Sequence, residues 1–265
     1  MTDSFELLNI AKQIAIAAGD FLQSRPENFK LSEKGSALDF ATQMDIECEA
    51  FIVEQIRKLR PTDAILGEEG GNEKGTSGLT WVIDPIDGTV NYLYGIPGWC
   101  VSIAVKDEKE VLAGVVNAPS VNSLWSAALG AGATCNEVRI ACNEPVTLNR
   151  ALVGTGFAYD LTARKPQGDF VNKLVTKVRD IRRLGACAAD ICMVASGKLD
   201  AYYEAGVNEW DFAAAGLIAR EAGAMVLARA NVPSTDQYFL LVAGPSLYRE
   251  LAQELIADGH WLSAI

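Results

Sequence analysis

Hydrophobic residues recur with two different periods in the first half of the chain. Over residues 4–24 the apolar positions have helical spacing and predict an amphipathic helix that buries Leu7, Ala11, Ile14, Ala18 and Phe21. A polar, Gly-containing segment at 30–44 is typical of a loop or hairpin, and the second helix after it is expected to bury Ile46, Ala50, Val53, Ile56 and Leu59. Short apolar runs then predict strands at 64–66, 81–83, 101–105, 111–118 and 123–128, the last three as an antiparallel meander.

The pattern changes near residue 148. From there, predicted strands alternate with predicted helices, which is typical of an α/β fold. The strands are expected at 151–154, 181–184, 199–204, 224–228 and 238–243, and the helices at 167–179, 187–197, 210–222 and 245–257. We therefore predict an α/β protein in two parts, with an α+β lobe over residues 1–147 and an α/β lobe over residues 148–265.

Composition narrows the chemistry that the chain can perform. Of its 265 residues, 49% are hydrophobic and 22% are charged, which predicts a globular protein rather than a disordered one. The net charge of −11 argues against direct binding of nucleic acid. The single histidine, His260, leaves little material for a histidine-based triad or a histidine-ligated zinc site. Any hydrolytic chemistry must therefore rest on carboxylates, hydroxyl groups and hard metal ions.

The cysteines and the N-terminus bear on location. None of the six cysteines belongs to a CxxC pair, so we expect reduced thiols and no disulfide between Cys135 and Cys142. The N-terminus is acidic, unlike a signal peptide, and no apolar run approaches the roughly 20 residues that a membrane span needs. These features predict a cytoplasmic protein that does not cross a membrane.

One stretch, residues 81–91, carries most of the candidate chemistry. It begins as an apolar, β-favouring strand, and Pro85 predicts that the chain turns directly after Asp84. Asp84 and Asp87 then lie three residues apart, where two carboxylates can share a divalent cation, and Gly88-Thr89 can open a helix. An Asp-rich turn that only caps a helix is the alternative, and this stretch alone leaves both interpretations open.

Two further acid sites lie at the ends of predicted elements. Glu68-Glu69 follows the strand at 64–66, and Asp211 precedes a helix rich in small residues, where an ordinary helix cap is the alternative interpretation. Oxygen ligands alone favour Mg²⁺, Mn²⁺ or Ca²⁺ over zinc. The helix start at Gly88-Thr89 offers backbone N–H groups to an anion. Because an acidic chain needs bound cations to attract a phosphate ester, the combination indicates phosphoryl chemistry.

Taken together, these motifs resemble those of the inositol monophosphatase family. The resemblance is carried by Gly67-Glu68-Glu69, by residues 81–91, by residues 209–216 (EWDFAAAG), and by residues 34–45 and 183–190. It covers essentially the whole chain in the family's motif order and is closest to the bacterial inositol-1-monophosphatases. It implies a layered α-β-α-β-α sandwich of the inositol monophosphatase and fructose bisphosphatase type. It also implies a lithium-sensitive, Mg²⁺-dependent phosphatase.

The resemblance assigns the metal ligands. Glu68, Asp84 and the carbonyl of Ile86 would hold a first Mg²⁺. A second ion would be held by Asp84, Asp87 and Asp211, and Glu68 would help to hold a weaker third. Two to three Mg²⁺ ions are thus implied, with Mn²⁺ as a substitute and Li⁺ and Ca²⁺ as inhibitors.

The resemblance also assigns the remaining roles. Gly88 and Thr89 would cradle the phosphate, while Asp45, Thr89 and Glu68 form the catalytic set that orients a water for in-line attack. Lys34 and Asp39 would belong to a mobile loop, although a solvated loop charge is the alternative for Lys34. The substrate's hydroxyl groups would meet Asp87, Ala186, Cys187, Glu204 and Asp211. A surface acid is the alternative for Glu204, and Glu69 is expected to be structural.

The implied substrate is a small polyol phosphate, first of all inositol 1-phosphate. Histidinol phosphate, fructose 1,6-bisphosphate and 3′-phosphoadenosine 5′-phosphate are the alternatives, because many relatives carry Ser or Thr where this chain has Ala186, followed by Cys187. The resemblance also implies a homodimer. A different class of function, a regulatory protein-binding factor of the transcription machinery, is the second hypothesis, because some bacterial relatives act in that way.

Overall fold

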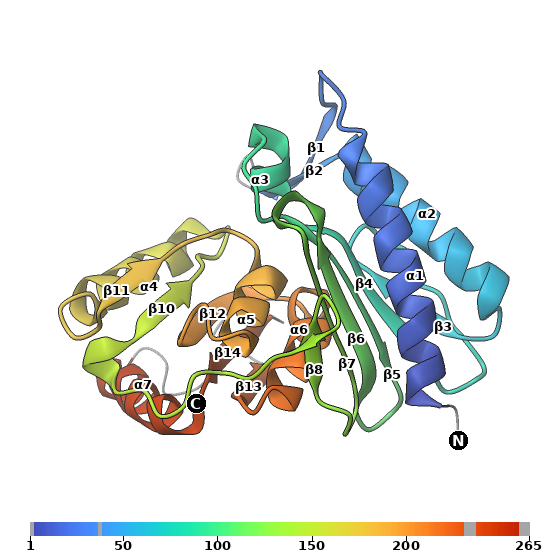
Figure 1. The fold of residues 1–265 in the computed structure, drawn as a ribbon. Helices are drawn as coiled ribbons and strands as arrows, with labels where there is room; N and C mark the ends of the chain where they lie inside the picture. The colour runs from blue at the N-terminus through green and yellow to red at the C-terminus, as the bar shows by residue number, and fades with distance from the viewer. Residues whose placement is uncertain (1–2, 37–38, 231–236, 260–265) are drawn as a thin grey trace.

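A computed structural model of the chain describes residues 3–36, 39–230 and 237–259. This part of the chain forms three sheets, of seven, five and two strands. The elements stack in the order helices, sheet, helices, sheet, helices (Figure 1). The layered α-β-α-β-α sandwich expected from the sequence is therefore confirmed.

The seven-stranded sheet forms the core of the N-terminal half. Its strands are, in spatial and sequence order, β3 (Ala64–Gly67), β4 (Thr80–Asp87), β5 (Cys100–Lys106), β6 (Val111–Ala118), β7 (Ser123–Ala128), β8 (Ala133–Cys135) and β9 (Val138–Arg139). β3 and β4 are parallel, and every later neighbour is antiparallel, which confirms the predicted meander. Short helical segments follow β4, as α3 (Thr89–Tyr94), and β6, as η1 (Pro119–Val121).

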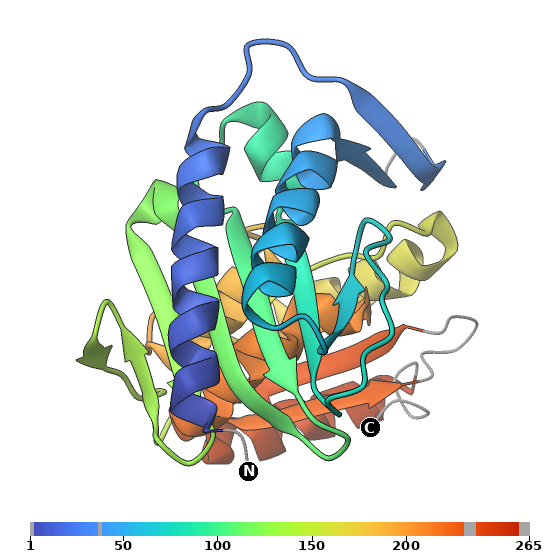
Figure 2. The same ribbon diagram turned by 90° about the vertical axis from the view of Figure 1, so that its right-hand side faces the viewer.

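Two long helices cover one face of this sheet. They are α1 (Ser4–Gln23) and α2 (Gln43–Leu59), which run side by side in Figure 2. In the sequence, the two helices are separated by the hairpin of β1 (Leu31–Ser36) and β2 (Asp39–Thr42), in agreement with the loop or hairpin expected there. Of the five positions predicted to be buried on α1, four are buried and Phe21 is half-buried.

The predicted buried face of α2 is confirmed at Val53 and Ile56 and wrong at the other three positions. Ile46 and Leu59 are 50% and 52% exposed, and Ala50 is exposed as well. The helix instead turns towards the sheet with the residues Met44, Asp45, Cys48, Glu49, Ile52, Val53 and Ile56. Two acids belong to that buried face, so a search for apolar periodicity could not find it.

The five-stranded sheet belongs to the second half of the chain. Its spatial order is β11 (Asp180–Arg182), β10 (Leu152–Thr155), β12 (Ala201–Val207), β14 (Tyr238–Ala243) and β13 (Met225–Ala230). Helices α5 (Cys187–Ala195) and α6 (Glu209–Glu221) pack between the two sheets, and α4 (Leu161–Leu174) and α7 (Pro245–Asp258) cover the outer face. The predicted division at residues 147 and 148 falls in the connection that contains η2 (Leu148–Arg150), and two separate lobes stay a prediction.

One helix of the second half begins earlier than predicted. The helix expected at 167–179 is α4, which starts at Leu161 and ends at Leu174. The side chain of Asp160 accepts a hydrogen bond from Thr162 N at 2.8 Å and fixes this start. The helix also runs through Pro166, whereas the predicted helix began just after that proline.

Asp63, which precedes β3, is a buried carboxylate with two strong donors. Arg60 Nε and Trp81 Nε1 each donate to Asp63 Oδ2 at 2.9 Å. Burial alone would raise the pKa of Asp63, but hydrogen bonds from Arg60, Trp81 and Ser77 outweigh it and lower that pKa. Because the folded pKa lies below the unfolded one, this stabilisation is present above the unfolded pKa and is lost as the pH falls through the folded pKa.

The change Asp63→Asn tests this contribution to stability. We expect it to lower the free energy of unfolding by about 2 kcal/mol at pH 7, because two buried donors lose a charged acceptor. The loss should shrink as the pH falls below about 4, the usual pKa of an aspartate in the unfolded chain, and should vanish below the lower pKa of the folded carboxylate. Urea denaturation at several pH values measures both. A loss of the same size at pH 7 and pH 3 would contradict this account.

Candidate active site

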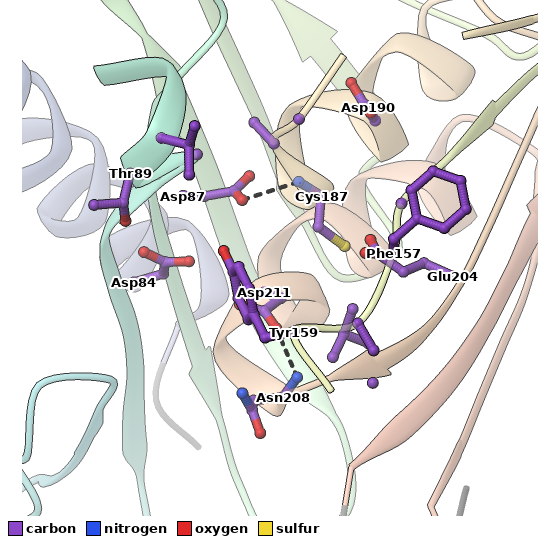
Figure 3. A pocket seen from close by; sticks show the side chains of 18 of the residues that line it. Asp84, Asp87, Thr89, Phe157, Tyr159, Cys187, Asp190, Glu204, Asn208 and Asp211 are labelled. Atoms are coloured by element: carbon purple, nitrogen blue, oxygen red, sulfur yellow. Dashed lines mark hydrogen bonds between the residues drawn. The ribbon is translucent and has the colours of Figure 1, made fainter. Parts of the chain in front are cut away.

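A pocket opens between the two sheets and collects nearly all of the predicted site residues. Those that line it are Lys34, Glu68, Asp84, Ile86, Asp87, Gly88, Thr89, Ala186, Cys187, Glu204 and Asp211. Figure 3 shows Asp84, Asp87, Thr89 and Asp211 grouped on one side of the pocket and Glu204 on the other. Asp45 lies behind Thr89, fully buried, and the side chain of Asp39 is outside the described residues.

Strand register places the first two acids beside each other. β3 and β4 run parallel with Gly67 opposite Ile83, so Glu68, which follows β3, lies beside Asp84, the next residue of β4. The backbone N–H of Glu68 donates to the carbonyl of Ile83 at 3.3 Å and ties the two strand ends together. The predicted clustering of acids at strand ends thus has a simple cause in the sheet.

The chain does not turn at Pro85, contrary to the prediction. β4 continues to Asp87, and its pairing with β5 shifts between Asp84 and Asp87, which marks a β-bulge. A bulge admits proline because the extra residue leaves the ladder. Ile86 N donates to Asp84 Oδ1 at 3.0 Å and closes the bulge. Asp84 and Asp87, on either side of the bulge, therefore both line the pocket, together with Ile86.

Asp87 joins the two halves of the molecule. Cys187 N donates to its Oδ1 at 2.9 Å, and Ala188 N donates to its Oδ2 at 2.7 Å, so Asp87 caps the start of α5 from another part of the chain (Figure 3). The thiol of Cys100 donates to Oδ2 as well, at 3.3 Å. Asp87 is therefore held rigidly, and it holds Ala186 and Cys187 at the pocket wall.

Gly88 makes this close approach possible. Its φ is 86°, in the left-handed region, and a Cβ there would lie 3.0 Å from Ala186 Cβ. The residue after it, Thr89, starts α3 and lines the pocket. A larger residue in place of Gly88 would be strained and would push α5 away.

Asp45 and Thr89 form a polar chain beneath the pocket. Thr89 Oγ1 lies 3.0 Å from Asp45 Oδ1 and 3.1 Å from the carbonyl of Ile86. Thr42 donates to Asp45 Oδ2 through its N–H at 2.8 Å and its hydroxyl at 2.6 Å. Burial raises the pKa of Asp45, although the Thr42 hydrogen bonds oppose the shift. The arrangement fixes the buried carboxyl group of Asp45 against the hydroxyl of Thr89, which lines the pocket.

Asp211 is fixed by its own helix start. The N–H of Asn208 donates to Asp211 Oδ2 at 2.6 Å, so the carboxylate closes the first turn of α6 from its third position (Figure 3). Asp211 is therefore not the cap residue itself, which is Asn208. Its second oxygen does not take part in that bond, and Asp211 lines the pocket.

These carboxylates crowd one another in a dry environment. Burial raises the pKa of Asp84 well above its usual value, and Glu68, Asp87 and Asp211 raise it further. Burial and Glu68 likewise raise the pKa of Asp211, and burial raises that of Asp87 to about 6 despite its hydrogen bonds. Crowded acids are relieved by a cation placed between them, which favours their ionised forms. The charge distribution of the site therefore fits a divalent cation.

The donor atoms fit a hard cation. Burial raises the pKa of the Cys100 and Cys187 thiols well above the usual value, so both stay neutral and oxygen atoms remain as the strong ligands. Within the described ranges, no three His, Cys, Asp or Glu side chains already form a finished ligand group. The fit to Mg²⁺ thus rests on the charge and chemistry of the donors, not on a preformed coordination geometry.

The hairpin of β1 and β2 reaches the pocket through Lys34. Its ammonium group donates to Glu68 Oε1 at 2.8 Å and pairs with Glu69 as well. Burial would lower the pKa of Lys34, but the two glutamates outweigh it and raise the pKa. Lys34 is therefore bound at the site rather than a freely solvated loop charge, and Glu69 contacts this lysine.

Glu204 lies on the opposite wall of the pocket and makes that wall acidic. Glu204 hydrogen-bonds the hydroxyl of Tyr202, and burial raises the pKa of Glu204 to about 7. Cys187 is 8% exposed and lies beside it in the pocket (Figure 3). Glu204 is thus a pocket residue, and the alternative of a surface acid is wrong.

Several pocket residues were not predicted. They include Thr155, Phe157, Tyr159, Asp190, Asn208 and Trp210. Asp190 Oδ2 and Trp210 Nε1 are buried without a hydrogen-bond partner among the described residues. Both lie inside motifs quoted for the family resemblance, so those motifs held the signal. The segment 155–159 carries no chemical motif and reaches the pocket only because β10 ends there.

Solved structures with the same architecture define the class of protein. The extragenic suppressor protein suhB of Bartonella henselae matches with a TM-score of 0.87 and 30% identity, over 94% of this chain and 98% of that one. Mycobacterium tuberculosis SuhB matches with a TM-score of 0.83 and 36% identity, over 97% and 98% of the two chains. The class is therefore the layered α/β fold of the SuhB and inositol monophosphatase structures.

Sequence comparison identifies the family. The model of the inositol monophosphatase family matches residues 3–260. The inositol-1-monophosphatase SuhB of Mycobacterium tuberculosis strain H37Rv is 39% identical, over 94% of this chain and 93% of that protein. A protein named Nus factor SuhB from Xylella fastidiosa is 38% identical, over 96% and 95%. The chain belongs to the inositol monophosphatase family, a family of phosphatases.

Proposed function

We propose that the chain is a Mg²⁺-dependent phosphatase that hydrolyses the phosphate monoester of a small polyol, with inositol 1-phosphate as its first candidate substrate. One observation carries the proposal: four acids from three separate places in the chain meet in one pocket beside the Asp45–Thr89 pair. Glu68 follows a strand end, Asp84 and Asp87 flank one bulge, and Asp211 lies at a helix start. Bringing buried acids together lowers the stability of the fold, and a shared function at one site accounts for such an arrangement.

Five residues would hold the cations in this proposal. They are Glu68, Asp84, Asp87, Asp211 and Ile86, the last through its carbonyl, and two to three Mg²⁺ ions, or Mn²⁺ in their place, would be bound. Bound Mg²⁺ supplies Lewis-acid chemistry, which lowers the pKa of water and neutralises the charge of the phosphate and the leaving oxygen. Calcium, which is larger and more loosely coordinated, would inhibit.

The phosphate and the attacking water would lie over the start of α3. Backbone N–H groups of Gly88 and Thr89 are available to phosphate oxygens, which prefer such helix starts. Thr89 has one hydroxyl proton, and when it donates to Asp45 its lone pairs can accept a hydrogen bond from the attacking water. Asp45, Thr89 and Glu68 thereby position the water for in-line attack, which is the main requirement of phosphoryl transfer.

The opposite wall of the pocket would determine which phosphate ester binds. Carboxylates of Asp87, Glu204 and Asp211 can accept hydrogen bonds from polyol hydroxyl groups, and Ala186 and Cys187 close the wall between them. Because Ala186 offers no hydroxyl, recognition there relies on shape. A panel of inositol 1-phosphate, histidinol phosphate, fructose 1,6-bisphosphate and 3′-phosphoadenosine 5′-phosphate tests the choice. The highest kcat/KM is expected for inositol 1-phosphate, and a preference for the nucleotide would overturn it.

Lithium offers a separate test of the metal assignments. We expect Li⁺ at millimolar concentration to inhibit the Mg²⁺-dependent activity, because the third ion, which Glu68 would help to hold, is the weakest and the easiest to replace. A titration of initial rates with LiCl, with KCl at equal ionic strength as the control, measures it. Activity that persists far above that range would contradict the role given to Glu68 at the third ion.

A second function is favoured by the names of several relatives. Three proteins at 38–39% identity are named Nus factor SuhB, so a regulatory protein-binding role in the transcription machinery is the alternative proposal. Loss of the cellular phenotype in Asp84→Asn would assign that phenotype to the phosphatase. A phenotype that survives this change would favour the binding role.

The proposed function also includes a cellular location and an oligomeric state. We propose a cytoplasmic homodimer with no direct contact to nucleic acid, in keeping with six free cysteines and a net charge of −11. No helix among the described residues has the length and apolar character needed to span a membrane. Light scattering that gives the mass of a monomer would contradict the dimer.

A further inference from the structure

Glu49 is a buried acid that the proposed reaction does not use. It lies on α2 one turn after Asp45, and only 4% of it is exposed. Its Oε2 accepts a hydrogen bond from Glu69 N at 2.8 Å, and its Oε1 accepts one from Gly71 N at 2.8 Å. One carboxylate therefore holds two backbone amides of the turn that follows β3.

The turn is shaped around this carboxylate. A Cβ built on Gly67 would lie 2.5 Å from Glu49 Oε2, and a Cβ on Gly71 would lie 2.8 Å from Oε1. Glycine at both positions lets the backbone approach the side chain closely. Glu68 lies inside this turn, with its neighbour's amide bound to Glu49 on one side and its own amide bound to Ile83 on the other.

The same helix also carries Asp45. Positions four apart on an α-helix share a face, so Asp45 and Glu49 both point from α2 towards the sheet and the site. Asp45 contacts Thr89, whereas Glu49 contacts the turn that carries Glu68. One rigid helix thus sets the separation between the water-orienting acid and the metal-binding turn.

We propose that Glu49 is a positioning residue that clamps the turn of residues 67–71 and thereby holds Glu68 in place for Mg²⁺. The inference rests on the proposed Mg²⁺ site, and it adds a residue that binds neither the ion nor the substrate. Residues that orient ligands from behind typically contribute 10- to 100-fold to metal affinity or activity. The carboxylate is suited to this task because each of its two oxygens accepts from one amide of the turn, that of Glu69 or that of Gly71.

Two substitutions and one matched control test the clamp. Glu49→Gln keeps one oxygen acceptor but turns an NH₂ group towards the other amide, and Glu49→Ala removes both acceptors. Glu47→Gln, on the exposed side of the same helix, is the control. Calorimetric titration with MgCl₂ gives the affinity without turnover. Hydrogen exchange of the Glu69 and Gly71 amides, followed by NMR in the presence of a chelator, reports on the turn itself.

The clamp predicts a graded result. Glu49→Gln should weaken Mg²⁺ binding about 10-fold and Glu49→Ala further, both amides should exchange faster, and saturating Mg²⁺ should restore most of kcat. Glu47→Gln should match the wild type. Folded Glu49 variants with wild-type Mg²⁺ affinity, or with unchanged exchange at both amides, would overturn the proposal. If Glu49→Ala does not fold, Glu49→Gln decides. If the wild-type chain itself binds no Mg²⁺, the proposed function fails, and the exchange data alone judge the clamp.

Discussion

The change Asp84→Asn is expected to lower kcat/KM for the preferred phosphate ester on the order of 10³-fold, about 4 kcal/mol of transition-state stabilisation. Asp84 is fully buried, and Glu68, Asp87 and Asp211 all raise its pKa beyond the effect of burial. In our proposal it is the ligand that two Mg²⁺ ions share. Steady-state kinetics of phosphate release at saturating Mg²⁺ measures the loss.

The same variant should not be less stable when a chelator is present. Asp84→Asn removes one of four crowded acids, so repulsion in the folded state falls. Denaturant unfolding in a chelator is therefore expected to give a free energy at least equal to that of the wild type. Asp169→Asn, which removes an exposed partner of Lys165, is the control and should keep its activity. A variant that loses stability and activity together would indicate a structural role for Asp84 instead.

The change Thr89→Val is expected to lower kcat by about 10²- to 10³-fold and to leave KM nearly unchanged. Valine keeps the branched shape at the start of α3 and the backbone N–H groups, but it removes the hydroxyl that lies 3.0 Å from Asp45. Binding of the phosphate should therefore persist while the attacking water loses its orientation. Initial rates over a range of substrate concentrations separate the two effects.

Serine at the same position supplies the matched comparison. Thr89→Ser retains the hydroxyl and should recover most of kcat. Asp45→Asn should resemble Thr89→Val, because the amide oxygen would face the two Thr42 donors and leave an NH₂ group, which is a donor, facing Thr89. A Thr89→Val enzyme with normal kcat and a raised KM would place Thr89 in substrate binding alone.

The acids of the site could be predicted because each stands where an apolar run ends or begins. A strand that ends just before Glu68 and a parallel neighbour that continues through Asp84 bring the two acids side by side, directly after their last paired residues. Their meeting with Asp211, far along the chain, could be expected only from the family resemblance. Spacing within one motif does not say which distant helix start will come near.

Buried polar residues could not be predicted from the sequence. On α2, Asp45 and Glu49 face the sheet, so the apolar pattern pointed to Ile46 and Leu59, which are exposed. At Pro85 the local rule predicted a turn, but a β-bulge lets the strand continue. In each case a tertiary contact, visible only in three dimensions, outweighs the local preference.

The pocket wall of residues 155–159 shows a different limit. These residues follow β10, and their place in the pocket depends on how the five-stranded sheet lies against α5 and α6. The segment contains no charged residue and no motif that would indicate a binding role. The predicted wall of Ala186, Cys187 and Glu204 was therefore incomplete, and Phe157 and Tyr159 had to be found from the structure.

Removal and return of the metal test the central claim most directly. The purified chain would be treated with a chelator, exchanged into metal-free buffer, and assayed for release of inorganic phosphate from inositol 1-phosphate before and after addition of MgCl₂. We expect negligible release without metal, full recovery with Mg²⁺, and no recovery in Asp84→Asn. Equal phosphate release with and without Mg²⁺, or recovery in the Asp84→Asn variant, would contradict a Mg²⁺-dependent phosphatase built on these four acids.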